Sequence, residues 1–182
     1  MGWEEYERRK KNRQWTEQDF AERVKVQNET RSYGQSCILN IILLASESGE
    51  AKNRCIGTTG YVAIETDGTG HLGIVTDRNT TKMGYATEAL YTSIVFGFER
   101  LGLTKIIMQT DEKNEAMREW CEKTAGLKVA WKNDVQINGY EYTQCGYTFT
   151  IDEWNSAIKQ KLEMKMNNII ASRARQPKPT NI

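Results

Sequence analysis

The sequence predicts a single α+β domain in which a sheet is flanked by helices. Short apolar runs of strand length alternate with longer segments of helical periodicity. The clearest strand runs are 37–45 (CILNIILLA), 55–65 (CIGTTGYVAIE) and 70–76 (GHLGIVT). Neither a repeat nor a linker divides the 182 residues, and this length fits one domain with a substantial core.

The N-terminal part is expected to form two helices followed by three antiparallel strands. Residues 3–14 are polar and helix-prone, and Thr16 with Asp19 resembles a capping box for a second helix that runs to about Thr30. The run 37–45 is continuously apolar, which predicts a strand buried on both faces. Asp67-Gly68 marks a tight turn between the next two strands.

A helix and a short strand are expected in the centre of the chain. From residue 86 onward, apolar side chains recur at helical spacing on one face: Ala86, Leu90, Ile94, Phe98 and Leu101. Gly102 provides the stop signal. Residues 105–109 (KIIMQ) then read as a short buried strand.

The C-terminal part predicts a helix, a hairpin and a last helix. Asn114 is placed to cap a helix with Met117, Trp120 and Cys121 turned inward, and Gly126 ends it. Strands at 128–137 and 140–150 flank Asn138-Gly139, a strong hairpin signal. Asp152 is expected to cap an extra C-terminal helix whose inner face is Trp154, Ile158, Leu162 and Met166.

Composition excludes several classes of function. The chain has 25 basic and 24 acidic residues, and a net charge of +1 gives no reason to expect nucleic acid or a membrane surface as partner. No apolar run approaches the roughly 18 residues of a membrane-spanning helix. The four cysteines lie far apart and His71 is the single histidine, so no metal site is expected. We therefore expect a cytoplasmic protein, with a domain at 1–172 and a flexible basic tail at 173–182.

The stretch TKMGYATEAL, residues 81–90, joins a strand to the central helix. The N-terminus of a helix presents unpaired N–H groups and partial positive charge, which favours anions. Gly84 and the small Ala86 allow close backbone approach, and Lys82 adds a cation. Glu88 balances the helix dipole but repels phosphate if it points at the loop. On spacing alone, an ordinary strand-to-helix turn explains Gly84 equally well.

Residues 73–127 resemble the acetyl-CoA-binding core of the GNAT N-acetyltransferase superfamily. The motifs are GYATEAL and the LGL segment, followed by an asparagine and a glycine. The chain is most similar to the branch of ribosomal-protein alanine, spermidine and antibiotic acetyltransferases. This resemblance implies a mixed, mostly antiparallel sheet flanked by helices. The sequence shows no counterpart of the family's first strand, and we expect this to leave the strand at 37–45 as an exposed edge. A longer parent chain, a partner chain such as a second copy, or the terminal helix can cover that edge.

The resemblance also implies which residues bind acetyl-CoA. Backbone groups of the strand at 74–76 face the pantetheine arm, and the loop and first helical turn hold the pyrophosphate. The expected set is Ile74, Val75, Thr76, Lys82, Met83, Gly84, Tyr85, Ala86, Thr87 and Asn114. Thr81 departs from the family pattern, which has arginine or glutamine there, and Lys82 departs from the usual glycine.

Catalytic residues are less clearly marked. The resemblance implies direct attack of a neutral amine on the thioester, with two proton transfers. Many GNAT enzymes have a tyrosine proton donor at the position of Cys121, for which a structural role is the alternative; Tyr85 and Tyr147 are other candidates. As general base we consider four side chains or a chain of waters. The four side chains are Glu65, His71, Asp111 and Glu112.

Two functions follow from these features. The first is an acetyl-CoA-dependent N-acetyltransferase that acts on a primary amine of a small molecule or of a protein N-terminus. The second is a catalytically impaired GNAT-like module that binds coenzyme or a partner protein without turnover. Gly84, Ala86 and Asn114 favour the first, whereas Thr81 and Cys121 favour the second.

Overall fold

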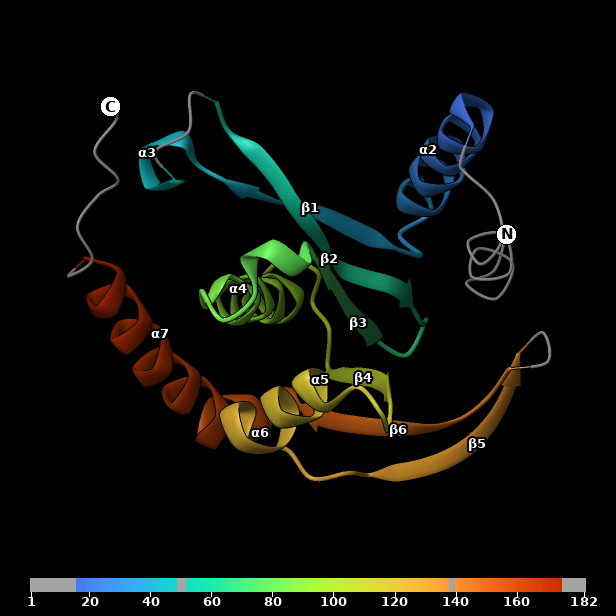
Figure 1. The fold of residues 1–182 in the computed structure, drawn as a ribbon. Helices are drawn as coiled ribbons and strands as arrows, with labels where there is room; N and C mark the ends of the chain where they lie inside the picture. Colours follow the sequence, from blue (N-terminus) through green and yellow to red (C-terminus); the bar gives the residue numbers. More distant parts are fainter. Residues whose placement is uncertain (1–15, 49–51, 138–139, 175–182) are drawn as a thin grey trace.

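The computed structural model describes residues 16–48, 52–137 and 140–174, and the described strands form one six-stranded sheet (Figure 1). Its order is β1-β2-β3-β4-β6-β5. Every neighbouring pair is antiparallel except β3 and β4, which are parallel. The strands are β1 (Cys37–Leu43), β2 (Arg54–Ile64), β3 (Thr69–Thr76), β4 (Lys105–Asp111), β5 (Trp131–Ile137) and β6 (Tyr140–Thr150). The predicted α+β class with a mixed, mostly antiparallel sheet is confirmed.

The first described helix, α2 (Glu17–Ser32), begins with the expected capping box. Thr16 Oγ1 accepts a hydrogen bond from the Asp19 N–H, and the Asp19 carboxylate accepts one from the Thr16 N–H. No residue of α2 is buried, and Phe20 and Val24 are 54% and 55% exposed. The helix is joined to β1 by polar contacts, because the Arg31 guanidinium donates to the Ile38 carbonyl over 2.7 Å.

The prediction that residues 37–45 form a strand buried on both faces was wrong. The strand ends at Leu43, lies at the edge of the sheet, and has only Leu43 buried, while Ile42 is 47% exposed. Residues 45–48 form the short helix α3 (Ala45–Ser48). Among the described residues, no strand pairs with the outer edge of β1.

Four helical segments follow the first three strands. They are η1 (Arg78–Thr80), α4 (Tyr85–Glu99), α5 (Glu115–Glu119), which continues as the π-helical η2 (Trp120–Ala125), and the terminal helix. The terminal helix consists of α6 (Ile151–Glu153), the π-helical η3 (Trp154–Ile158) and α7 (Lys159–Ala174). No helix of the described ranges is long and apolar enough to span a membrane.

The terminal helix differs from expectation at both ends. Thr150, not Asp152, caps it, since the Thr150 hydroxyl accepts from the Glu153 N–H and the Glu153 carboxylate accepts from the Thr150 N–H. At the other end Arg173 belongs to α7 and not to a tail. The predicted helix at 3–14 and the turn Asn138-Gly139 lie outside the described residues.

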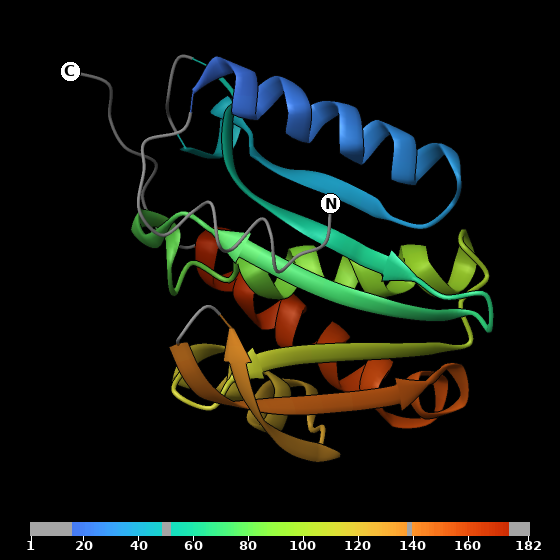
Figure 2. The same ribbon diagram turned by 90° about the vertical axis from the view of Figure 1, so that its right-hand side faces the viewer.

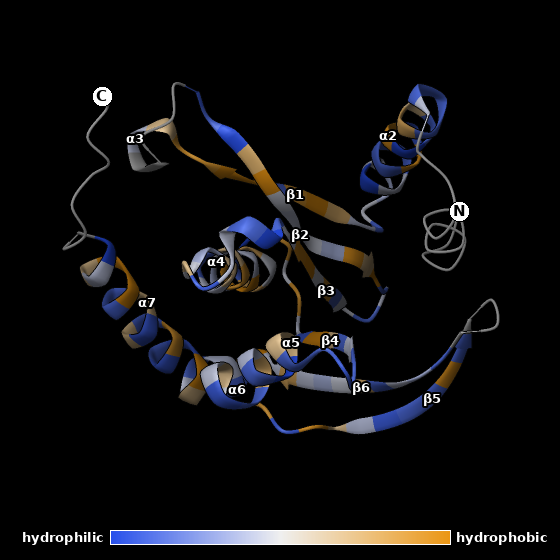
Figure 3. Ribbon diagram, viewed as in Figure 1, coloured by the Kyte–Doolittle hydropathy of each residue, from blue (hydrophilic) through white to orange (hydrophobic). Residues whose placement is uncertain are grey.

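The core lies between the sheet and the helices α4, η2 and η3–α7. Central strands contribute Leu72, Ile106, Met108, Tyr147 and Phe149, and the helices contribute Leu90, Ile94, Phe98, Trp120, Cys121, Trp154 and Leu162. Hydrophobic stretches run along β1, β3 and β4, whereas β5 is mostly hydrophilic (Figure 3). The first part of the terminal helix is therefore fixed in the core, while the last turns of α7 contact the residues at the start of α4.

Candidate active site

The sheet opens in its middle, between β3 and β4. The two strands pair only from Thr69–Lys105 to Leu72–Met108. Beyond this point β3 continues against β2, and β4 continues against β6. The strands therefore diverge toward their carboxyl ends (Figure 2). We call this opening the splay and the Leu72–Met108 pair its apex.

The splay leaves one backbone edge of β3 without a strand partner. Ile74, Val75 and Thr76 pair with Thr59, Thr58 and Gly57 of β2 on one side only. Their other side faces away from β2 and has no register with β4. Because backbone amides need partners, this edge suits a linear ligand that carries amide groups of its own.

The loop after β3 is braced by Asp77. Its carboxylate accepts from the Asn79 N–H and from the Arg54 guanidinium, at 2.9 and 3.0 Å. These hydrogen bonds, with that to Asn79 first, hold the pKa of Asp77 below its ordinary value. The Thr80 hydroxyl donates to the Asp77 carbonyl, and Thr80 is buried. The loop thus has a defined shape before α4 begins.

The entry to α4 has two residues in the left-handed region of backbone space. Lys82 has a φ of 63° and Gly84, the N-cap of α4, has a φ of 83°. A positive φ is uncommon for lysine and is often found at functional sites. Gly84 has no side chain with which to cap α4, so the N–H groups of the first turn have no acceptor within the helix. The backbone here has the character of an anion site.

Two of the expected loop residues turn their side chains toward other helices. The Thr87 hydroxyl accepts from the Trp120 indole N–H over 3.2 Å, and Thr87 is buried. Its side chain therefore ties α4 to η2, and only its backbone is available to a ligand. Tyr85 lies under the Arg173 guanidinium, whose Cζ is 4.1 Å from the ring centre.

The end of α7 packs directly on the entry to α4. A Cβ atom at Gly84 would lie 2.5 Å from Cγ2 of Ile169, so only glycine fits. The Arg173 Nε and Nη2 atoms donate to the Met83 carbonyl at 3.0 and 2.8 Å, and Nη1 donates to the Glu88 carboxylate at 3.0 Å. Gly84 was expected to ease either a turn or phosphate approach, but it also admits α7.

Asn114 stands where β4 gives way to α5. Its Oδ1 accepts from the Met117 N–H over 3.2 Å, which confirms the predicted capping role. With Oδ1 engaged in capping, Nδ2 is the donor that this side chain can offer to a ligand. The open end of the splay is therefore bordered by the entry to α4 on one side and the entry to α5 on the other.

Comparison with known proteins identifies this arrangement. A family model for the acetyltransferase (GNAT) domain matches residues 2–126. The chain belongs to this family. No curated protein matches the sequence at a significant level.

Solved GNAT structures share the fold at low sequence identity. A GNAT-family acetyltransferase from Bacillus anthracis is 19% identical, with a TM-score of 0.61 over 76% of this chain and 77% of that one. The spermidine/spermine N-acetyltransferase SpeG from Vibrio cholerae is 14% identical, with a TM-score of 0.62 over 75% and 79%. The microcin C7 self-immunity acetyltransferase MccE, solved with acetyl-CoA and AMP, is 16% identical, with a TM-score of 0.60 over 74% and 71%.

Cys121, at the position of the GNAT tyrosine, is placed in the core. It is 0% exposed, and burial raises the pKa of its thiol to about 12. A side chain enclosed in this way has no surface to offer a substrate, and this burial argues against the expected role as proton donor. The alternative structural role accounts for its position.

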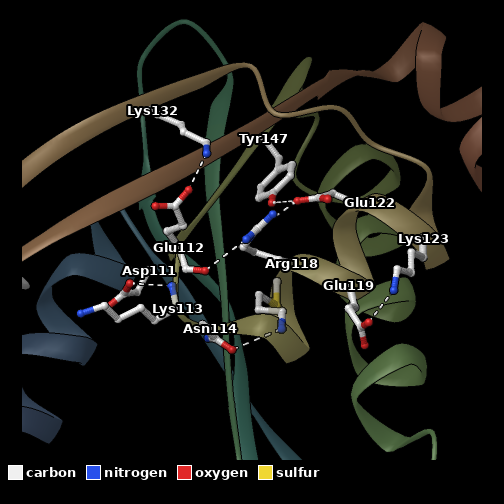
Figure 4. Close-up of polar contacts among 11 residues, drawn as sticks. Asp111, Glu112, Lys113, Asn114, Arg118, Glu119, Glu122, Lys123, Lys132 and Tyr147 are labelled. Atoms are coloured by element: carbon white, nitrogen blue, oxygen red, sulfur yellow. Dashed lines mark hydrogen bonds and ion pairs between the residues drawn. The ribbon is translucent and has the colours of Figure 1, made fainter.

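Glu112 is also poorly suited to be a base. Its carboxylate accepts from Lys132 Nζ on β5, and this bond holds the pKa of Glu112 below its ordinary value (Figure 4). A carboxylate that prefers its ionised, paired state is a weak proton acceptor. The Asp111 carboxylate makes a hydrogen bond within its own loop, because its Oδ1 accepts from the Lys113 N–H over 2.8 Å.

Glu65 and His71, weighed separately above, form one pair. His71 Nε2 is hydrogen-bonded to the Glu65 carboxylate. An ionised carboxylate only accepts, so in the neutral form of the imidazole Nε2 carries the proton and Nδ1 holds the lone pair. His71 precedes the apex residue Leu72, and successive strand residues point to opposite faces. Since Leu72 is in the core under the helices, His71 lies on the other face of the sheet.

A polar network beside α5 joins Tyr147, a candidate proton donor, to two residues that the sequence did not mark, Arg118 and Glu122. Buried Tyr147 donates to the Glu122 carboxylate over 2.7 Å, and Arg118 donates to both Glu122 and the Glu112 carbonyl (Figure 4). Burial, and then the bond to Glu122, raises the pKa of Tyr147.

No group of three or more metal-ligating side chains occurs within 16–48, 52–137 and 140–174.

Proposed function

We propose that this protein transfers the acetyl group of acetyl-CoA to a primary amine of a small molecule or of a protein N-terminus. The observation that carries the proposal is the splay with the entry to α4 at its open end. The free edge of Ile74–Thr76 offers partners to the amides of pantetheine, and the N–H groups of the first turn of α4 suit the pyrophosphate. Acetyl-CoA, when bound, supplies the activated thioester.

The positions of these two features support one direction for the bound coenzyme. The entry to α4 follows the carboxyl end of β3, so a pyrophosphate held there lies at the open end of the splay. An arm that runs back along residues 76–74 brings its thioester end toward the apex at Leu72 and Met108. The backbone N–H groups near the apex then suit the developing negative charge on the thioester oxygen.

The Glu65–His71 pair offers a general base near the apex, with His71 as the proton acceptor. His71 is next to Leu72 on the face opposite the core helices, where an amine can approach the thioester from the side not used by the coenzyme. The Nδ1 lone pair of His71 accepts the proton as the amine nitrogen bonds to the carbonyl carbon. Glu65 holds the imidazole through Nε2–H and balances its positive charge. The carbon–sulfur bond then breaks, and the thiolate is protonated from water.

Coenzyme binding and turnover test the function. Calorimetric titration with acetyl-CoA is expected to give one site per chain, and release of free thiol is expected with at least one member of an amine panel. The panel contains spermidine, because SpeG carries that name, and peptides with a free N-terminus. A protein that does not bind acetyl-CoA at millimolar concentration refutes the proposal. Binding without release of thiol on any amine favours the non-catalytic coenzyme-binding module instead.

The base is tested by His71→Ala and by Glu65→Gln. We expect the first to lower the turnover rate on the best amine by about 10²–10⁴-fold without changing the affinity for acetyl-CoA. Added imidazole is expected to restore part of the rate of the His71→Ala protein only. Glu112→Gln is the matched control, since it removes a charge from a carboxylate that Lys132 already occupies. Unchanged turnover in His71→Ala would leave water as the base.

A further inference from the structure

The terminal helix brings a guanidinium to the entry of α4. Arg173 is 90 residues from Met83 in the sequence, yet it makes two hydrogen bonds to the Met83 carbonyl and lies over the Tyr85 ring. Its side chain is 21% exposed, and Ile169, one turn earlier, contacts Gly84. Two successive turns of α7 therefore adjoin the loop assigned above to the coenzyme's pyrophosphate.

The Met83 carbonyl holds the Arg173 guanidinium in a fixed position at the entry to α4. Nε and Nη2 share one acceptor, the carbonyl of the residue before the N-cap, and this fixes the plane of the group. The Nη1 atom then points to the Glu88 carboxylate, which is one turn inside α4. An oxyanion at the entry to α4 can replace this carboxylate as the acceptor from Nη1, because planar guanidinium groups bind carboxylate and phosphate oxygens alike.

The local charges also favour an anion. A cation beside the N-terminus of a helix opposes the helix dipole. Lys82 adds a second positive charge to the same loop. Glu88 compensates one of these charges, and its pairing with Arg173 keeps the carboxylate from acting as an unpaired negative charge at the loop. A pyrophosphate with two or more negative charges complements the positive charge that remains on this loop and at the N-terminus of α4.

We propose that Arg173 is a ligand of the coenzyme's pyrophosphate, so that the anion site is built from the loop at 81–87 together with the last turns of α7. This inference rests on the proposed function, since it concerns the same coenzyme. Arg173 supplies the side-chain cation that Thr81 lacks. When the pyrophosphate binds, Nη1 leaves Glu88 for a phosphate oxygen, while Nε and Nη2 stay on the Met83 carbonyl.

A competing possibility is that the end of α7 is a lid that acetyl-CoA has to displace. The two readings predict opposite signs when the contact is removed. Loss of a ligand weakens coenzyme binding, whereas loss of a lid strengthens it. The sign of the change in affinity therefore decides between them.

The experiment measures the affinity of four proteins for acetyl-CoA and for acetyl-pantetheine, which lacks the pyrophosphate. We expect Arg173→Gln to weaken acetyl-CoA binding at least about tenfold and to leave acetyl-pantetheine binding unchanged. Glu88→Gln is expected to tighten acetyl-CoA binding, because the carboxylate no longer competes for Nη1. Lys165→Gln, at an exposed position of α7, removes the same charge and is expected to behave as wild type.

The outcomes separate this inference from the proposed function. If wild type binds acetyl-CoA and Arg173→Gln binds it equally well or more tightly, the role of Arg173 is overturned. The proposed function then still stands. If Arg173→Gln weakens the binding of acetyl-CoA and of acetyl-pantetheine alike, Arg173 acts in folding and the proposal is overturned. A Glu88→Gln protein that binds acetyl-CoA more weakly leads to the same conclusion. Wild type that does not bind acetyl-CoA overturns both proposals.

Discussion

Replacement of Gly84 by alanine tests the contact between α7 and the entry to α4. Two costs are expected. A left-handed φ of 83° costs an L-residue about 1–2 kcal/mol. The new Cβ would lie 2.5, 3.0 and 3.3 Å from Cγ2, Cδ1 and Cγ1 of Ile169, and such overpacking costs a further ~1–3 kcal/mol. We therefore expect Gly84→Ala to lower the free energy of unfolding by about 2–5 kcal/mol.

A double-mutant cycle with Ile169→Ala isolates the second cost. This substitution deletes the three Ile169 atoms that the new Cβ would meet, so Gly84→Ala should then cost only about 1–2 kcal/mol. Urea unfolding followed by far-ultraviolet circular dichroism gives the four free energies. Gly102→Ala is the matched control, because Gly102 also has a positive φ of 67° but nothing lies within 4 Å of its Cβ position. An equal cost of Gly84→Ala in both backgrounds would refute the contact.

Three further predictions concern the core. Thr87→Val should lower the free energy of unfolding by about 1–3 kcal/mol because the Trp120 indole N–H loses its acceptor, and Thr87→Ser, which keeps the hydroxyl, should cost less in the same unfolding assay. Because burial raises the pKa of Cys121 from 9.0 to about 12, its contribution to stability is complete below pH 9 and is lost as pH rises toward 12. In Cys121→Ala, stability should fall less steeply over that range, and parallel curves would contradict this reasoning. In thiol labelling of the native protein, exposed Cys55 should react before buried Cys121 and Cys145, and simultaneous reaction would show that the core is open.

Local patterns in the sequence predicted most of the fold. The Thr16–Asp19 capping box, the turn at Asp67-Gly68 and the helix that starts after Gly84 depend on neighbouring residues, and each is confirmed. The burial of β1 was misjudged, because an apolar run records hydrophobicity but not what covers the two faces of the strand. Thr150 was missed as a cap because Asp152 offers the same chemistry two residues later.

The candidate site was predictable only where it is continuous in the sequence. The loop at 81–87 could be found from its glycine and the helix that follows. The proposed role of α7 could not be predicted, because it depends on a contact between residues 90 positions apart. The sequence does show that Arg173 follows Leu162, Met166 and Ile169 at helical spacing on one face. Cys121 fits a catalytic position by residue counting, but counting does not show that the side chain is enclosed.

The dependence of the α4 entry on α7 has a consequence for the order of folding. Residues 81–87 are made in the first half of the chain, but their neighbours Ile169 and Arg173 come near its end. Closing so long a loop carries a large entropic cost and is favoured only after the sheet has formed. Hydrogen exchange of the first turn of α4 should therefore report on the integrity of the carboxyl-terminal helix. A chain shortened before residue 169 would keep its sheet and lose the ordered entrance to the proposed coenzyme site.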